Sequence, residues 1–218
     1  MSYCVALKLS RGLIFMSDTL TNGGLDDISN YPKTFSWGVP GDRQILLTTA
    51  GNLATSQAVV KTLSEQIKDK NNGSQSILNA PTMFQVARIV SQTLAEVIDV
   101  SSKWHQKAEN KFSANFILGG QINNNEMALY LIYPEGNFIE VSNKKPFFQI
   151  GETKYGRPIL VRAFEPEMSF EDAIRLLMVS FDSTIKANLS VGLPLDLSIY
   201  INDRYQKTRV AYFSIFNP

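Results

Sequence analysis

A serine, an aspartate, a lysine and a glycine stand at or just beyond the ends of apolar runs early in the sequence. They are Ser2, Asp18, Lys33 and Gly51. If Met1 is removed, Ser2 carries a hydroxyl and a free α-amine, and an α-amine that titrates near ~8 can act as the base for its own hydroxyl. A nearby cation such as Lys33 would favour the alkoxide and lower the pKa of that amine. These residue types predict nucleophilic catalysis by an N-terminal serine.

Asp18 and Gly51 fit supporting roles in that chemistry. The carboxylate of Asp18 could keep Lys33 charged and oriented. Gly51 follows an apolar run and precedes a helical pattern, so its N–H is unobstructed and lies near the positive end of a helix. Such an N–H is suited to stabilise the oxyanion of a tetrahedral intermediate. A purely structural role stays open, because surface ion pairs and turn glycines are common.

The composition narrows the classes of function that the chain could have. The 218 residues are 44% hydrophobic and carry a net charge of +1, which allows a substantial core and gives no global field for nucleic acid or an acidic membrane. Cys4 is the only cysteine and His105 the only histidine, so we expect no internal disulfide, no metal and no cofactor. A Ser-His-Asp triad would have to use His105, which lies in a polar stretch. Charged residues interrupt the first apolar run, so we expect no signal peptide and a cytoplasmic location.

Apolar periodicity predicts the elements that would position these residues. Strand patterns cover 1–9, 13–18, 34–37, 44–50, 113–118, 127–133, 137–141, 147–150, 195–201 and 209–216. Helical patterns cover 53–67, 82–98 and 169–187. A loop covers 21–24, and an irregular stretch covers 26–31. Thr82 with Gln85 and Ser169 with Asp172 resemble helix N-cap pairs. Runs of strands separated by helices indicate an α+β class with antiparallel sheets covered by helices. We expect one domain, residues 1–218.

Several segments carry a family resemblance that spans almost the whole chain. Strand 12–18 ending in Asp18, Lys33 after a glycine-containing loop, and segment 48–51 resemble the β-type subunits of the proteasome and the bacterial peptidase HslV. A closer resemblance is to the bacterial proteasome homologue called Anbu, carried by segments 2–9, 17–24, 150–158 and 188–194.

The resemblance implies the four-layer αββα sandwich of N-terminal-nucleophile hydrolases, with two antiparallel sheets flanked by helices. It implies that Ser2 is the nucleophile of a peptidase and that its own amine acts as base through a water. Asp18 and Lys33 would tune the site, the Gly51 N–H would bind the oxyanion, and Ser190 would help anchor the N-terminus.

The resemblance also implies partners. Peptide or protein would be the substrate, with Thr21 and Gly51 binding it. The chain would associate with itself into a ring or an open helical homo-oligomer; an ATP-dependent unfoldase partner is left open. We expect neither nucleic acid nor membrane as a partner.

Two alternatives remain open. Proteasome-type enzymes normally begin with Thr, and Ser lacks the methyl group that restricts χ1. Glu152 stands where the peptidases usually have a small hydroxyl residue, and no acidic residue directly precedes Ser190. A proteasome-fold scaffold with weak or no catalysis is therefore one alternative, and an amidase that acts on a small modified peptide is the other.

Overall fold

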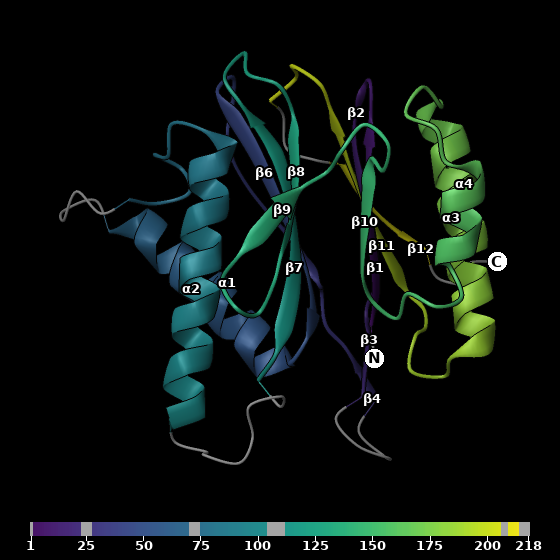
Figure 1. Cartoon of the computed structure of the whole chain (residues 1–218), viewed down its shortest axis with the longest axis horizontal. Helices are drawn as coiled ribbons and strands as arrows, with labels where there is room; N and C mark the ends of the chain where they lie inside the picture. Colours follow the sequence, from purple (N-terminus) through teal and green to yellow (C-terminus); the bar gives the residue numbers. More distant parts are fainter. Residues whose placement is uncertain (1, 23–27, 70–74, 104–111, 206–208, 214–218) are drawn as a thin grey trace.

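Two five-stranded antiparallel sheets form the centre of the molecule (Figure 1). The computed structural model describes residues 2–22, 28–69, 75–103, 112–205 and 209–213. The first sheet has the order β10 (Phe147–Gly151), β1 (Tyr3–Leu9), β2 (Gly12–Asp18), β11 (Leu195–Ile201) and β12 (Arg209–Phe213). The second has the order β5 (Thr34–Val39), β6 (Arg43–Gly51), β7 (Ala114–Ile122), β8 (Ala128–Ile132) and β9 (Phe138–Glu140). A two-stranded ribbon, β3 (Leu20–Asn22) with β4 (Ile28–Asn30), extends from the end of β2.

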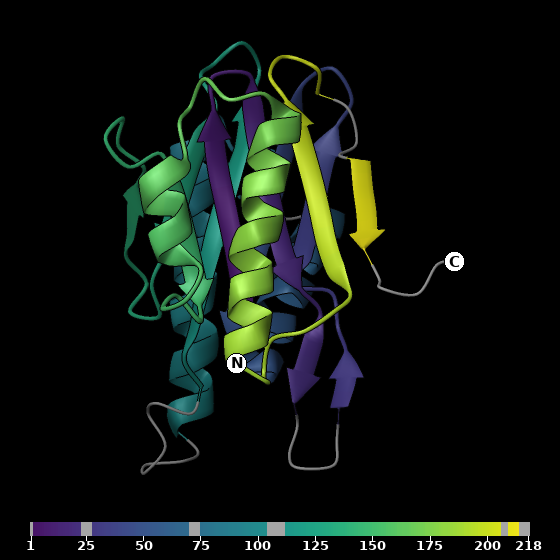
Figure 2. The same ribbon diagram turned by 90° about the vertical axis from the view of Figure 1, so that its right-hand side faces the viewer.

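Helices cover the outer face of each sheet, which confirms the predicted αββα sandwich (Figures 1 and 2). Helices α1 (Leu53–Lys68) and α2 (Met83–Lys103) lie on the second sheet, and α3 (Arg157–Ala163) and α4 (Phe170–Ala187) lie on the first. Both predicted N-caps are confirmed. The Ser169 side chain accepts from the Asp172 N–H, and Thr82 Oγ1 accepts from the Gln85 N–H at 3.3 Å. None of the helices in the described residues combines the length and apolar character needed to cross a bilayer.

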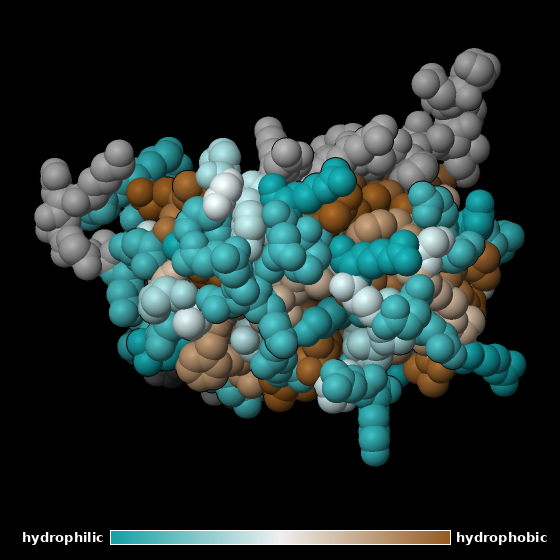
Figure 3. Space-filling model, turned by 90° about the horizontal axis from the view of Figure 1, so that it is seen from above, coloured by the Kyte–Doolittle hydropathy of each residue, from teal (hydrophilic) through white to brown (hydrophobic). Residues whose placement is uncertain are grey.

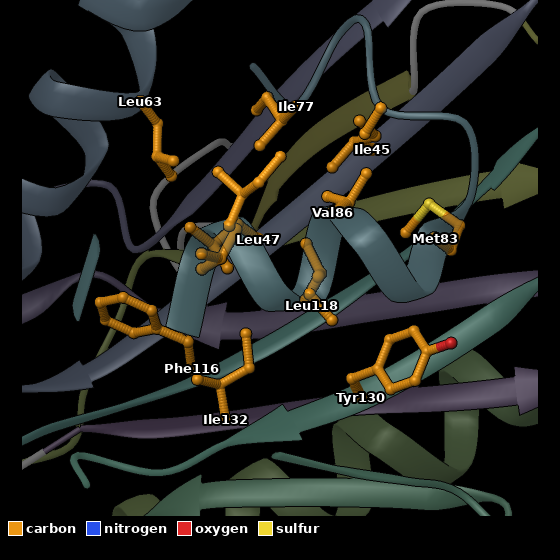
Figure 4. Packing of buried hydrophobic residues seen from close by; sticks show 14 of the residues in the cluster. Ile45, Leu47, Leu63, Ile77, Met83, Val86, Phe116, Leu118, Tyr130 and Ile132 are labelled. Atoms are coloured by element: carbon orange, nitrogen blue, oxygen red, sulfur yellow. The ribbon is translucent and has the colours of Figure 1, made fainter. Parts of the chain in front are cut away.

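The layer between the second sheet and its helices is built from apolar and aromatic side chains (Figure 4). Strand alternation sends Leu47 and Leu118 toward the helices and Leu46 and Ile117 toward the other sheet. All four side chains are fully buried. Full burial of each such side chain contributes roughly 1.5–3 kcal/mol, so this packing fixes β6 and β7 in place.

The layer between the two sheets is apolar near the β1–β2 turn. Leu13 and Phe15 of β2 lie there against the second sheet. A Cβ atom on Gly119 would come within 2.9 Å of the Phe15 ring, so this glycine lets the sheets approach closely. β2 is buried along its whole length, as its apolar sequence predicts.

Three parts of the fold differ from the sequence prediction. β7 continues through Gly119 and Gly120 to Ile122, because the close approach of the sheets favours glycine within the strand. Part of the predicted loop 21–24 and of the irregular stretch 26–31 forms the β3–β4 ribbon. Helix α3 was not predicted, because its seven residues are too few for a periodic signal. The predicted strand 209–216 is described only as far as Phe213, and His105 lies outside the described residues.

Candidate active site

The buried ion pair of Lys33 and Asp18 is the centre of the candidate site. Lys33 Nζ lies 2.7 Å from Asp18 Oδ1 and donates to the Leu20 carbonyl at 2.7 Å. Asp18 is fully buried and Lys33 is 5% exposed. Burial raises the pKa of Asp18, against the opposing effects of the Lys33 ammonium and the Tyr3 N–H. The pair holds a fixed ammonium group at the end of β2.

The start of β1 is held against this ion pair. The Tyr3 N–H donates to Asp18 Oδ1 at 2.9 Å, so the oxygen that accepts from Lys33 also holds the residue after Ser2. The Tyr3 hydroxyl is hydrogen-bonded to Ser180 Oγ on α4 at 2.7 Å. The half-buried Ser2 therefore precedes a residue whose backbone is bonded to the carboxylate of the ion pair and whose side chain is bonded to α4.

Gly51 adopts a backbone conformation that favours glycine. Its φ is +118°, and a Cβ atom there would lie 2.5 Å from the Ser113 carbonyl oxygen. The Asn52 N–H donates to that same carbonyl at 2.9 Å. Because hydrogen-bonded pairs alternate along an antiparallel ladder, the N–H of Gly51 points away from β7. This N–H therefore takes no part in the β6–β7 ladder, and Gly51 lies two residues before the start of α1.

Ser2 and the end of β6 lie on either side of Gly151. A Cβ atom on Gly151 would be 2.0 Å from the Ser2 carbonyl oxygen and 3.5 Å from the Ala50 Cβ. This closeness brings the region of Gly51 to the start of β1, although the two are far apart in the sequence. Ser2, Asp18, Lys33 and Gly51 therefore gather at one end of the sandwich.

The other two predicted site residues are Ser190 and Thr21. In the described part of the chain, the hydroxyls of Ser190 and Thr21 make no hydrogen bond with Ser2. Ser190 lies between α4 and β11, and its N–H donates to Asn188 Oδ1 at 2.9 Å. Thr21 lies on β3, next to the Leu20 carbonyl that accepts from Lys33.

Comparison with known proteins decides the family. The family described as "Proteasome subunit" matches residues 2–198. The chain belongs to the proteasome subunit family. No curated protein matches the chain at a significant level.

Among solved structures, the chain is similar to Anbu proteins from several bacteria. Anbu (ancestral beta-subunit) from Yersinia bercovieri is 39% identical with a TM-score of 0.90, over 98% of this chain and 88% of that one. Anbu from Hyphomicrobium sp. strain MC1 is 43% identical with a TM-score of 0.89, over 98% and 88%. The structure described as a helical assembly of the Anbu complex from Pseudomonas aeruginosa is 42% identical with a TM-score of 0.92, over 99% and 88%. The predicted resemblance to Anbu is confirmed.

The sequence interpretation missed Asp196, a buried carboxyl of this proteasome-family site. Asp196 lies on β11 opposite Ser17 and is 3% exposed. Its Oδ1, like Oδ2 of Asp18, has no hydrogen-bond partner among the described residues. Burial raises the pKa of Asp196 to about 6; Lys33 opposes this shift and the Asp18 charge adds to it. The signal in the sequence was a single aspartate within the otherwise apolar start of the strand.

Hydroxyl groups join the two sheets beside this charged cluster. Ser17 Oγ lies 3.2 Å from Thr34 Oγ1, which lies 2.8 Å from Thr48 Oγ1. Ser17 belongs to the first sheet and the two threonines to the second. The buried hydroxyls in this network satisfy one another's hydrogen-bonding groups, and the network links the two sheets rigidly next to the proteasome-family site.

A pocket of about 310 Å³ lies at the opposite end of the sandwich. It is lined by Lys8, Ser10, Asn125, Glu126 and other residues near the β1–β2 turn, and it includes none of the predicted site residues. Figure 3 shows this end of the molecule, where hydrophilic side chains alternate with smaller hydrophobic areas. This hollow is separate from the candidate active site.

Proposed function

We propose that this proteasome-family chain is an N-terminal-nucleophile hydrolase that cleaves amide bonds in peptides, with Ser2 as nucleophile after removal of Met1. The observation that carries the proposal is the double role of Asp18 Oδ1. It accepts from Lys33 Nζ at 2.7 Å and from the Tyr3 N–H at 2.9 Å. One carboxylate oxygen therefore binds both the ammonium group and the first residue of β1. A buried ion pair contributes little net stability compared with apolar packing, so a role in chemistry accounts better for its presence.

The proposed reaction is acyl transfer in two steps. The α-amine of Ser2 takes the hydroxyl proton through a water while Oγ attacks the substrate carbonyl carbon. The carbonyl electron pair moves to oxygen, and the resulting oxyanion is stabilised by the Gly51 N–H and by the field of Lys33. The tetrahedral intermediate then breaks its C–N bond, and the leaving amine takes the proton from the α-ammonium. Water hydrolyses the ester on Ser2 by the same route and restores the free serine.

We further propose that the substrate is a peptide or protein and that Thr21 and Gly51 contact it. A homo-oligomer, as a ring or an open helix, is the expected form of the protein. The similarity to the Pseudomonas aeruginosa structure, described as a helical assembly, supports this form. Any unfoldase partner is left open, and the cytoplasmic location stays a prediction.

Peptide hydrolysis by wild-type and Ser2→Ala proteins tests the proposal. A panel of fluorogenic peptides should be cleaved by the wild type, and the Ser2→Ala variant should lose at least ~10³-fold in rate, because the covalent route is removed. Equal hydrolysis by both would exclude Ser2 as the nucleophile. A wild type that cleaves no peptide and no small amide would favour the scaffold alternative, and one that cleaves only small modified peptides would favour the amidase.

A further inference from the structure

Glu152 connects Ser2 to the segment that carries Ser190. The Glu152 N–H donates to the Ser2 carbonyl at 2.7 Å. Its Oε2 accepts from Asn188 Nδ2 at 2.8 Å, and Asn188 Oδ1 accepts from the Ser190 N–H at 2.9 Å. Residues from three separate parts of the chain thus form one unbroken series of hydrogen bonds.

Local hydrogen bonds and a close approach of two strands fix the backbone around Glu152 and Asn188. Gly151 has φ +82°, and a Cβ atom there would lie 2.0 Å from the Ser2 carbonyl oxygen, so β10 passes the strand start at a distance that only glycine allows. Glu152 Oε1 accepts from the Lys154 N–H at 2.9 Å. The Asn188 N–H donates to the Thr184 carbonyl at 2.9 Å and so closes α4. The backbone on both sides of the Glu152–Asn188 contact is therefore fixed independently of that contact.

The direction of the central hydrogen bond is fixed by chemistry. An ionised carboxylate only accepts, so Asn188 must present its amide nitrogen to Glu152 and its oxygen to Ser190. Hydrogen bonds to a charged group are roughly twice as strong as neutral ones. Glu152 is half-buried, so solvent screens this bond less than it screens the exposed ion pairs on α4.

We propose that Glu152 is a positioning residue for Ser2. Its carboxylate orients Asn188, and through Asn188 it fixes the Ser190 segment against the strand start. Ser2 is then held on one side by Asp18, through Tyr3, and on the other by Glu152, through its own carbonyl. A displacement of about 1 Å at a reacting group can cost about 10²-fold in rate, so this second support matters for a nucleophile. The inference rests on the proposed function only in taking Ser2 as the reactive residue.

Reversing the polarity of the pair tests the inference. Asn188→Asp places two carboxylates face to face and should slow acylation of Ser2 by about tenfold or more. Glu152→Gln keeps a hydrogen bond but removes its charge and should cost a few-fold. The double variant Glu152→Gln/Asn188→Asp restores one carboxylate with one amide and should return to within about threefold of the wild type. Asp182→Asn, which removes only an exposed carboxylate paired with Lys186 on α4, is the matched control and should change nothing.

Two readouts separate this inference from the proposed function. The first is acylation of Ser2 by a peptide electrophile, followed by intact mass, in which positioning should change the limiting rate and leave the half-saturating concentration unchanged. The second is hydrogen exchange at the amides of Glu152 and Ser190, which needs no catalysis. Asn188→Asp should speed exchange at both amides, and the double variant should restore both. Failure of the wild type to react overturns the proposed function alone. Unchanged exchange at Glu152 in Asn188→Asp, or a double variant as impaired as Asn188→Asp, overturns the positioning role.

Discussion

Two packing interfaces of the sandwich differ in what they bury. The layer between α1, α2 and the second sheet is built from apolar and aromatic side chains such as Leu47 and Leu118. The layer between the sheets is apolar at one end, around Phe15, but at the Ser2 end it contains an ion pair that spans the sheets. Asp18 comes from the first sheet, and Lys33 immediately precedes β5 of the second.

Packing energy explains the residues of one interface but not the buried charges of the other. Apolar contacts account for the interface between the second sheet and helices α1 and α2, because burial of such side chains is the main favourable term in folding. Buried charges lose their hydration, and well-packed apolar residues are often as stable or more stable in their place. The charged end of the interface between the two sheets is therefore better explained by chemistry at Ser2 than by stability.

Lys33→Met should have the largest effect on both stability and reactivity. It leaves the Asp18 carboxylate buried without its cation, which should cost about 3–5 kcal/mol in the free energy of unfolding and abolish acylation of Ser2. The double variant Lys33→Met/Asp18→Asn should recover much of the stability and none of the reactivity. Denaturant unfolding and intact mass after treatment with an electrophile measure the two quantities. Acylation of Lys33→Met at the wild-type rate would contradict the proposal that the buried ion pair serves the chemistry of Ser2.

Leu118→Ala tests the apolar layer by itself. Leu118 is fully buried between β7 and the helices, so its truncation should cost about 2–5 kcal/mol through lost transfer energy and a cavity. The folded variant should still acylate Ser2 at the wild-type rate. A matching fall in acylation, measured well below the unfolding transition, would show that the two layers are not independent.

Asp196→Asn should reveal a pH-dependent difference in stability. The pKa of Asp196 is about 6 in the folded protein, against ~3.9 in an unfolded chain. The folded state therefore binds this proton more tightly, and the contribution of Asp196 to wild-type stability falls as the pH rises from about 4 through about 6. Asparagine removes that loss, so the variant should gain on the order of 2 kcal/mol relative to the wild type between about pH 4 and about pH 7.5. Thermal unfolding at the two pH values measures the gain, and a difference that does not change with pH would show that Asp196 does not titrate in the interior.

Most of the sandwich and the centre of the site could be predicted from the sequence. The apolar runs predicted β2 and β6 at the correct places in the chain. Asp18 and Gly51, which were expected at the ends of these runs, are the last residues of the two strands. Asp18, Lys33 and Gly51 were therefore accessible to sequence reasoning, because each lies at an end of a strand pattern: Asp18 ends β2, Lys33 directly precedes β5, and Gly51 ends β6.

Contacts between distant segments could not be predicted in the same way. The Glu152–Asn188 bond joins residues that follow β10 and α4, and no periodicity relates them. Asp196 becomes notable only when the register places it opposite Ser17 inside the sandwich. The β3–β4 ribbon depends on pairing across residues with weak strand patterns, so composition favoured a loop.

Ser2, with a free amine, is the residue that we propose to be reactive. Intact mass of the native protein, before and after treatment with an acylating peptide electrophile, tests it most directly. We expect a mass that lacks Met1 and then the addition of one adduct. Fragmentation should place this adduct on Ser2, and the Ser2→Ala protein should not take it up. A protein that retains Met1, or that lacks Met1 and takes up the adduct equally in Ser2→Ala, would contradict it.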